Sequence, residues 1–296
     1  LFGTPDDPRV PPECNLDIEK LRLAAGPVRS DIVGRKNGLY REHCSHCHGV
    51  TGDGMGPTAA FLNPYPRDYR PGVFKFKSTE RADKPTHDDL VMVLHNGLAG
   101  SSMPSFALLS DAKIDALVEY VKYLSIRGEV ELSLMRAFFE LDDEDEGVLP
   151  QTREFLFEEI IDPVAERWVA AEDAVIDVPE MPADIDMVAS IAKGKELFYG
   201  NKANCVKCHG VSGLGDGQAN DYDDWNKVVL QAHNTVEGGF KQAEKASTWE
   251  MSTEEREEHR MELAWLDRFN SVLDGNALEP RMIRPRNLRQ GVYRGG

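Results

Sequence analysis

The sequence contains no long apolar run and has fewer basic than acidic residues. No stretch of about 18 apolar residues occurs, the least that crosses a bilayer as a helix, so we expect no transmembrane segment. Lys and Arg number 34 against 51 Asp and Glu, which gives a formal net charge of −17. Neutralising phosphates requires clustered Lys and Arg, so this balance argues against nucleic acid as a partner. The negative charge instead favours docking to a basic protein surface.

The chain begins at Leu1 with neither a methionine nor a leader, so we expect a mature or trimmed product. Its 296 residues have room for about two domains. Only five cysteines are present. One of them, Cys14, follows no apolar stretch, so the sequence gives no support for a lipid anchor. A free thiol and an intermolecular pair both stay open for Cys14.

The other four cysteines lie in two copies of the pentapeptide Cys-x-x-Cys-His. Each copy is followed by a glycine-rich run. Two thiols three positions apart reach the two vinyl groups on one edge of a porphyrin, and the adjacent His then supplies an axial nitrogen to the iron. This is the attachment motif of a c-type haem, so we expect two haem c groups. The residues concerned are Cys44, Cys47 and His48 in the first copy and Cys205, Cys208 and His209 in the second.

Zinc and dithiol chemistry are the competing interpretations of these cysteines. A zinc ribbon pairs two Cys-x-x-Cys units about 15–20 residues apart, whereas the two motifs here lie in opposite halves of the chain. A thioredoxin-type dithiol does not call for a histidine after both motifs. Both alternatives therefore rank well below haem.

Helical patterns surround the first motif. We expect a short helix near 16–25, a helix leading into the motif over 34–43, and further helices over 86–96 and 111–126. The last of these begins after Ser110, a candidate N-cap. It carries an apolar stripe made of Ile114, Leu117, Val118, Val121 and Leu124. Residues 128–180 are acidic and also helical in pattern.

The order of the first unit recurs in the second half of the chain. Glycine-rich loops follow both motifs, and Leu39-Tyr40 before the first is echoed by Leu197-Phe198 before the second. Segment 66–75 matches segment 285–294 at five of ten positions. This similarity indicates an internal duplication.

The second copy differs from the first by a long insertion. His48 precedes Arg67 by 19 residues, whereas His209 precedes Arg286 by 77. The insertion includes a polar helical stretch whose apolar stripe we expect to pack on a partner subunit or on the acidic helices of residues 128–175, with a buried core helix as the simpler alternative. The segment that follows Arg67 in the first copy has no counterpart in the second. Either the C-terminal part of the second copy is missing from this chain, or the second haem is completed differently. The stripe consists of Leu263, Leu266, Phe269 and Leu273.

Met103 is the predicted sixth ligand of the first haem, opposite His48. It precedes a proline and lies just before the helix expected over 111–126. A thioether ligand raises the reduction potential of a haem. Met in general is a core residue, and Met55 and Met92 are weaker rivals. The sixth ligand of the second haem stays open between a residue beyond 296, a ligand from a neighbouring chain, and the candidates His233, Met251, His259, Met261 and Met282.

Arg67 and Arg286 occupy equivalent positions in the repeated segment. Either guanidinium can pair with a haem propionate through a bidentate contact. A surface loop without that role is an equally weighted interpretation.

The first unit resembles class I cytochromes c of the bacterial periplasmic type. The resemblance rests on the helix before Cys44, the motif ending at His48, the glycine-rich loop, Met103-Pro104 and the last helix. It implies an all-α fold with two cytochrome-c-like haem domains joined by an acidic helical segment. The expected parts are an N-terminal arm (1–30), a first cytochrome c domain (31–127), an acidic helical linker (128–182), and a second domain (183–296) with a helical insertion at about 218–281.

The resemblance also implies outer-sphere electron transfer between redox protein partners by a dihaem electron carrier, like the subunits that accompany membrane respiratory complexes. Haem is attached to thiols on the exported side of bacterial membranes, which implies a periplasmic location. A dihaem peroxidase-like enzyme with an open distal site at the second haem, and a subunit of a larger multihaem assembly, stay open as alternatives. The candidate cofactor-binding residues are Cys44, Cys47, His48, Met103, Cys205, Cys208, His209, Arg67 and Arg286, and the candidate iron ligands are His48, Met103 and His209.

Overall fold

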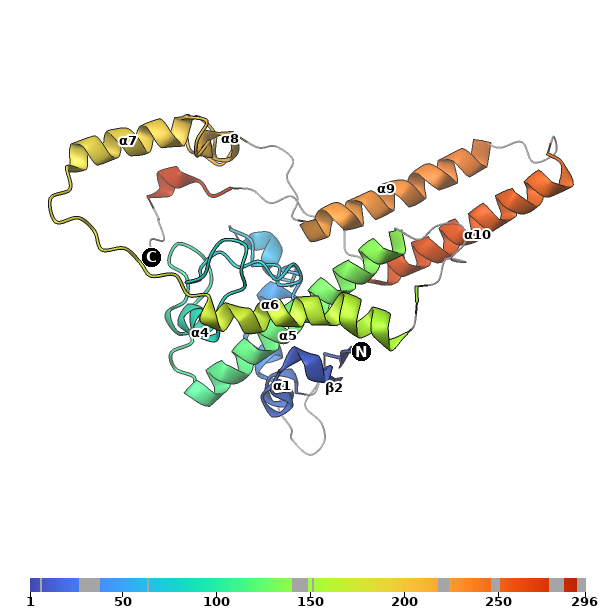
Figure 1. Cartoon of the computed structure of the whole chain (residues 1–296), viewed down its shortest axis with the longest axis horizontal. Coiled ribbons are helices and arrows are strands. Elements are labelled where there is room, and N and C mark those ends of the chain that lie inside the picture. The colour runs from blue at the N-terminus through green and yellow to red at the C-terminus, as the bar shows by residue number, and fades with distance from the viewer. Residues whose placement is uncertain are drawn as a thin grey trace. The chain divides into compact units, whose positions relative to one another are not determined.

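The computed structural model describes residues 1–5, 7–26, 38–62, 64–139, 149–150, 152–217, 224–245, 251–276 and 285–291. Over these residues the chain is mostly helical, and its strands are confined to the hairpin of β1 (Gly3–Thr4) and β2 (Asp7–Pro8). The predicted all-α fold is confirmed. The chain divides into two compact units (Figure 1). Unit 1 comprises Leu1–Ser133, Pro150–Ala219 and Arg284–Gly296, and unit 2 comprises Leu134–Leu149 and Asn220–Ile283.

The core of unit 1 is built on the long helix α5 (Asp111–Phe139). Its start agrees with the prediction, and the predicted apolar stripe is buried: Leu117 and Val118 are fully inaccessible to solvent. The helix continues well past residue 126 because the apolar pattern continues, with Val130 and Leu132 also buried. Within α5, residues 134–139 belong to unit 2 and the preceding ones to unit 1, so one helix contributes to both units.

The first 25 residues pack on α5 instead of forming an extended arm. Phe2 is buried, and its carbonyl accepts a hydrogen bond from the Tyr123 hydroxyl at 2.5 Å. The Tyr120 hydroxyl donates to the carbonyl of Pro5 at 3.1 Å. After the 3-10 turn η1 (Pro12–Cys14), helix α1 (Ile18–Ala25) forms where the short helix was predicted. The Asp17 carboxylate caps this helix by accepting from its first free N–H groups.

The first motif lies on two short helices joined at Cys44: α2 (Leu39–His43) and α3 (Ser45–His48). Tyr40 anchors them to α5, since its ring lies 4.8 Å from that of Tyr120 and both are almost fully buried. The turn η2 (Ala59–Phe61) and the predicted helix α4 (His87–Asn96) follow. Thr86 begins α4 through a reciprocal capping box with Asp89. The loops that follow the first motif thus lie among helices (Figure 1).

The acidic segment after α5 folds onto the loops of the first half. It contains a π-helix, η4 (Glu154–Ile161), which continues into α6 (Asp162–Ala170) and the turn η5 (Ala171–Asp173). Beyond η5 the chain pairs with residues near 78: the Ile176 N–H donates to the Ser78 carbonyl at 2.9 Å. The Glu172 carboxylate accepts from the His87 N–H at the start of α4. The domain boundaries expected from the sequence stay predictions.

The second motif is preceded by α7 (Met187–Tyr199), lies on α8 (Cys205–His209), and is followed much later by the turn η6 (Leu288–Gln290). Asp186 caps α7 by accepting from the N–H groups of Val188 and Ala189. No residue of α7 is buried. This half therefore differs from the first, in which Tyr40 packs on α5.

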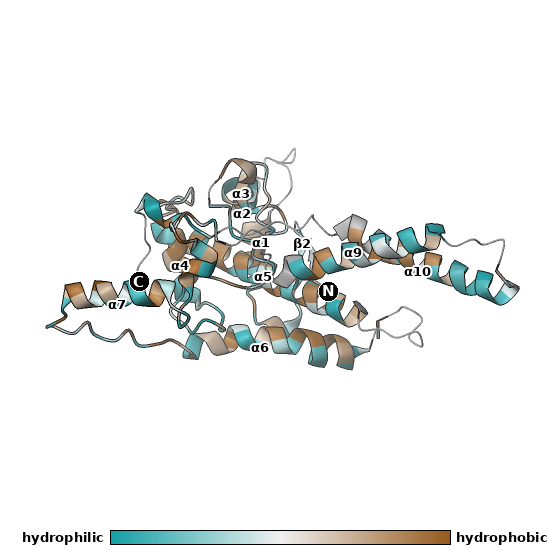
Figure 2. Ribbon diagram, turned by 90° about the horizontal axis from the view of Figure 1, so that it is seen from above, coloured by the Kyte–Doolittle hydropathy of each residue, from teal (hydrophilic) through white to brown (hydrophobic). Residues whose placement is uncertain are grey.

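Unit 2 consists mainly of the two inserted helices α9 (Asp224–Lys245) and α10 (Thr253–Asn276), which lie side by side (Figures 1 and 2). Phe269 and Leu273 of α10 pack against Ala232 and Val236 of α9. The end of α5 joins this core, with the ring of Phe138 stacked on that of Phe269 at 5.2 Å. The α10 stripe thus packs mainly on α9, within the insertion, and also contacts the end of α5, one of the partners expected for it. Among the described helices, none is both long and apolar enough to cross a membrane.

Candidate haem sites

The first motif presents two free thiols on consecutive turns. Cys44 is buried at the joint between α2 and α3, and Cys47 is half-buried one turn later. Burial, together with the neighbouring Cys47, raises the pKa of the Cys44 thiol to about 12. The Cys47 sulfur lies 3.2 Å from the Thr58 hydroxyl. Neither cysteine is in a disulfide, so both sulfurs are available for thioether formation.

His48 is held so that only one ring nitrogen is left for a metal. Its Nδ1 lies 3.0 Å from the carbonyl oxygen of Arg67, and because a carbonyl only accepts, Nδ1 must carry the proton. Burial lowers the pKa of His48 to about 4, so the imidazole is neutral. The Tyr69 ring stacks on it at 4.6 Å. A hydrogen bond of this kind fixes the tautomer and ring orientation of a metal-ligating His and leaves Nε2 as the ligating atom.

The loop after His48 is shaped by glycines in the left-handed region, where a side chain is strained. The Gly54 N–H donates to the His48 carbonyl at 2.8 Å, and the Gly52 carbonyl accepts from the Tyr69 N–H at 2.7 Å. These bonds bring segment 66–70 back over the motif. The glycines with positive φ are Gly49 (+76°), Gly52 (+80°) and Gly54 (+72°).

The second motif repeats this arrangement bond for bond. His209 Nδ1 lies 3.1 Å from the carbonyl of Arg286, and the Gly215 N–H donates to the His209 carbonyl at 2.8 Å. The Leu288 N–H donates to the Gly213 carbonyl at 2.7 Å. The equivalent glycines are again left-handed: Gly210 (+78°), Gly213 (+70°) and Gly215 (+79°). The internal duplication predicted from the sequence is therefore confirmed at the level of the backbone.

The two copies differ at the helix that precedes the motif. The Tyr40 hydroxyl donates to the Gly49 carbonyl at 2.9 Å, and in the second copy the Tyr199 hydroxyl donates to the Val211 carbonyl at 2.9 Å. Tyr199, the residue after Phe198, therefore makes a bond similar to that of Tyr40, but to the carbonyl one position further along the loop. The extra residues of the second copy form a turn over 200–203 that ends at Asn204, which has a positive φ of 49°.

Met103 lies in a turn that is built by its neighbours and is itself half-exposed. The Met103 carbonyl accepts from the Leu98 N–H at 3.1 Å, and the Met103 N–H donates to the Ser101 hydroxyl at 3.2 Å. Gly97 packs so closely on this turn that a Cβ there would lie 2.7 Å from the Pro104 carbonyl carbon. The loop thus has a defined conformation just before α5. Ligation of iron by Met103 stays a prediction.

Arg67 and Arg286 act on the histidines through their carbonyl oxygens, a role that sequence reasoning missed. Arg67 is exposed, whereas the Arg286 guanidinium donates to the Gly100 carbonyl at 3.3 Å. Pairing of either guanidinium with a propionate stays a prediction. The repeat of 66–75 at 285–294 was the signal that marked these residues, but it did not indicate that their backbone carbonyls contact the histidines.

Comparison with known proteins agrees with this geometry. Residues 34–121 match the family described as cytochrome C oxidase, cbb3-type, subunit III, and residues 191–268 match the cytochrome c family. The chain is therefore a dihaem c-type cytochrome with two cytochrome c domains in tandem. It carries two haem c groups. The second match ends before segment 285–291, which the structure places against His209.

One solved structure shows a weaker likeness. A chain of a reducing HAO-like protein complex from Kuenenia stuttgartiensis has 25% sequence identity and a TM-score of 0.37. The match covers 60% of this chain and 62% of that chain, so this chain spans less than two thirds of its length. A comparison with the curated proteins gave no match.

The residues present fit haem c. The cysteines of both motifs form no disulfide and have the attachment spacing, and each motif ends in an imidazole whose Nδ1 is bonded to a carbonyl. A zinc site needs further Cys, His or carboxylate ligands, and the described residues contain no cluster of three or more such groups.

Proposed function

We propose that the chain is an electron carrier in which both haems relay electrons between redox protein partners on the exported side of the membrane. The observation that carries the proposal is the pair of equivalent histidine bonds, His48 to Arg67 and His209 to Arg286. Two proximal ligands oriented in the same way favour two permanently ligated haems. The acidic balance of the chain supports a basic surface on at least one partner.

In the proposed carrier, each residue of the two motifs would have a separate role in holding haem. Cys44 and Cys47 fix the first haem covalently, and Cys205 and Cys208 fix the second. His48 and His209 would bind iron through Nε2, since Nδ1 is occupied in each ring. When bound, haem supplies one-electron chemistry whose potential depends on the axial ligands and on burial. Met103 would complete the first site, and Arg67 and Arg286 remain the candidates for pairing with propionates.

The spectrum of the purified holoprotein tests whether the protein is a carrier. If both irons have two protein ligands, the oxidised protein shows only six-coordinate low-spin haem. Reduction should likewise leave no five-coordinate species, and added peroxide should leave the spectrum of the ferric protein unchanged except for slow bleaching. A substantial high-spin fraction that reacts rapidly with peroxide would instead support the peroxidase-like alternative and contradict the carrier.

A further inference from the structure

A column of aromatic rings runs from the proximal histidine of the first site to helix α6. Tyr69 stacks on His48 at 4.6 Å with the planes 16° apart, and Phe74 stacks on Tyr69 at 6.0 Å. The column ends at Trp168 of α6, whose ring meets Phe74 edge-on at 6.0 Å and is buried. Helix α6 lies outside both stretches that match cytochrome families. A helix outside the family matches is therefore connected to His48 through the rings of Trp168, Phe74 and Tyr69.

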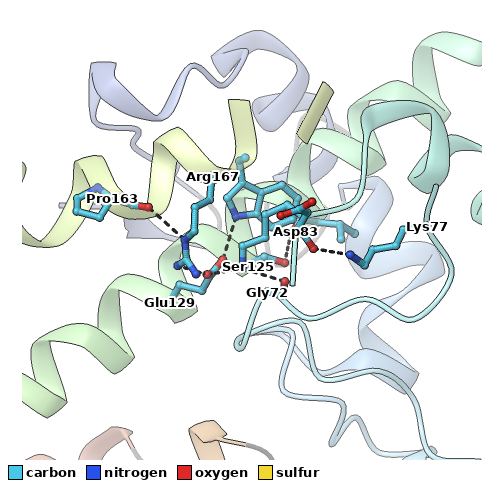
Figure 3. Close-up of polar contacts among 10 residues, drawn as sticks. Gly72, Lys77, Asp83, Ser125, Glu129, Pro163 and Arg167 are labelled. Carbon is cyan, nitrogen blue, oxygen red and sulfur yellow. Dashed lines mark hydrogen bonds and ion pairs between the residues drawn. The ribbon is translucent and has the colours of Figure 1, made fainter. Parts of the chain in front are cut away.

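A buried ionic network fixes Trp168 in this position (Figure 3). The Glu129 carboxylate of α5 accepts from the Trp168 indole N–H at 2.9 Å, from the Arg167 guanidinium at 2.8 Å and from the Lys84 ammonium at 2.5 Å. The Lys84 ammonium also donates to the Gly72 carbonyl at 3.0 Å. Because Gly72 lies between the column residues 69 and 74, the network and the ring column hold the same loop.

The loop is packed too tightly on α5 to move independently. A Cβ added at Gly72 would lie 2.0 Å from the Glu129 carboxylate, and one added at Gly128 of α5 would lie 2.4 Å from the Cα of Arg70. Because the backbones of the loop and α5 are this close, neither can shift without the other. A change at Trp168 therefore has a direct route to Tyr69 and to His48.

The second haem half lacks this column in the residues that the structure describes. Leu288 stands where the first copy has Tyr69. The ring nearest to His209, that of Phe198, is tilted and lies 6.5 Å away. The duplication thus supplies an internal comparison: both halves have the same histidine–carbonyl bond, and within the described residues only the first half has an aromatic column.

We propose that Trp168 is a positioning residue for the proximal ligand of the first haem. Through Phe74 and Tyr69 it keeps the His48 imidazole in one plane and keeps water from that side of the ring. Water stabilises the more highly charged ferric state, so shielding raises the reduction potential of this haem. The inference rests on the proposed function in that His48 is taken as an axial ligand.

Redox titration of the full-length holoprotein, with EPR of its ferric form, tests the proposal. The variants are Trp168→Leu, which removes the edge-on ring and the N–H donor, and Trp168→Phe, which keeps the ring alone. Val169→Ala is the matched control, because Val169 is the next residue of α6 and is 51% exposed. The wave of the first haem is the one that persists when Cys205 and Cys208 are both replaced by alanine.

We expect Trp168→Leu to lower the potential of the first haem and shift its low-spin EPR signal, with Trp168→Phe giving a smaller shift in the same direction. The second haem and the Val169→Ala protein should be unchanged. If Trp168→Leu lowers the unfolding midpoint but moves neither the potential nor the EPR signal, the role is structural only and the proposal is wrong. In that case both haems would still be low-spin, so the proposed electron-carrier function would not be affected.

A second variant keeps the proposal testable if Trp168→Leu does not fold. Phe74→Leu interrupts the column between Trp168 and Tyr69 and removes none of the hydrogen bonds to Glu129. It should shift the potential and the EPR signal of the first haem in the same direction. An unchanged potential and signal in a folded Phe74→Leu protein overturns the proposal.

Discussion

Replacing Met103 by alanine is expected to remove the long-wavelength Met–iron charge-transfer band and to lower the reduction potential of one haem, leaving the other haem unchanged. The physical reason is the loss of a thioether ligand, which favours ferrous iron, from a turn that has no other sulfur ligand to offer. The turn itself should persist, because Gly97, Leu98 and Ser101 define it through backbone contacts that do not involve the Met103 side chain. Absorption spectra of the ferric protein and a redox titration measure both effects.

Met92→Ala is the control for this experiment. Met92 lies on α4, also in the first haem half, and is 55% exposed. Its replacement should leave the band and both potentials as they are. If the band survives in Met103→Ala and disappears in Met92→Ala, the assignment of the sixth ligand is wrong.

Replacing Glu129 by alanine is expected to produce a large loss of stability. The variant leaves the buried Lys84 ammonium and the Trp168 indole N–H without their acceptor. Breaking a buried ion pair by removing one partner costs about 3–5 kcal/mol, because an uncompensated charge stays buried. The free energy of unfolding, taken from denaturant titration of the holoprotein, measures the loss.

Glu131→Ala is the matched control on the same helix. Glu131 pairs with Arg127 one turn away, and its side chain is 41% exposed. Pairs of this kind contribute about 0.3–0.5 kcal/mol. Equal losses in the Glu129 and Glu131 variants would show that the network around Glu129 does not hold the loop of the first site.

The sequence predicted the parts of the fold that depend on local pattern. The motif, the stripe of α5 and helix α4 are readable because thioether chemistry and the helical period each constrain neighbouring residues. The repeat of 66–75 at 285–294 located the segment that contacts each histidine, although it did not reveal that the contact uses a backbone carbonyl.

The parts that sequence reasoning missed depend on contacts between residues far apart in the chain. The buried hydrogen bond from Tyr123 to the Phe2 carbonyl spans 121 positions, and no pattern in the first 25 residues predicts it. The role of Trp168 is equally non-local, since its partners are Phe74 and Glu129. Packing of the inserted helix on Phe138 was predicted only as one of three options, because an apolar stripe indicates that a helix face is covered but does not identify the covering segment.

The mass of the denatured holoprotein tests most directly whether two equivalent motifs hold two haems covalently. We expect a chain that carries two haem additions under conditions that unfold it and retains them in acid–acetone. Replacing Cys44 and Cys47 by alanine should remove one addition, and replacing Cys205 and Cys208 should remove the other. A native chain of unmodified mass, or haem that extracts into acid–acetone, would contradict the claim.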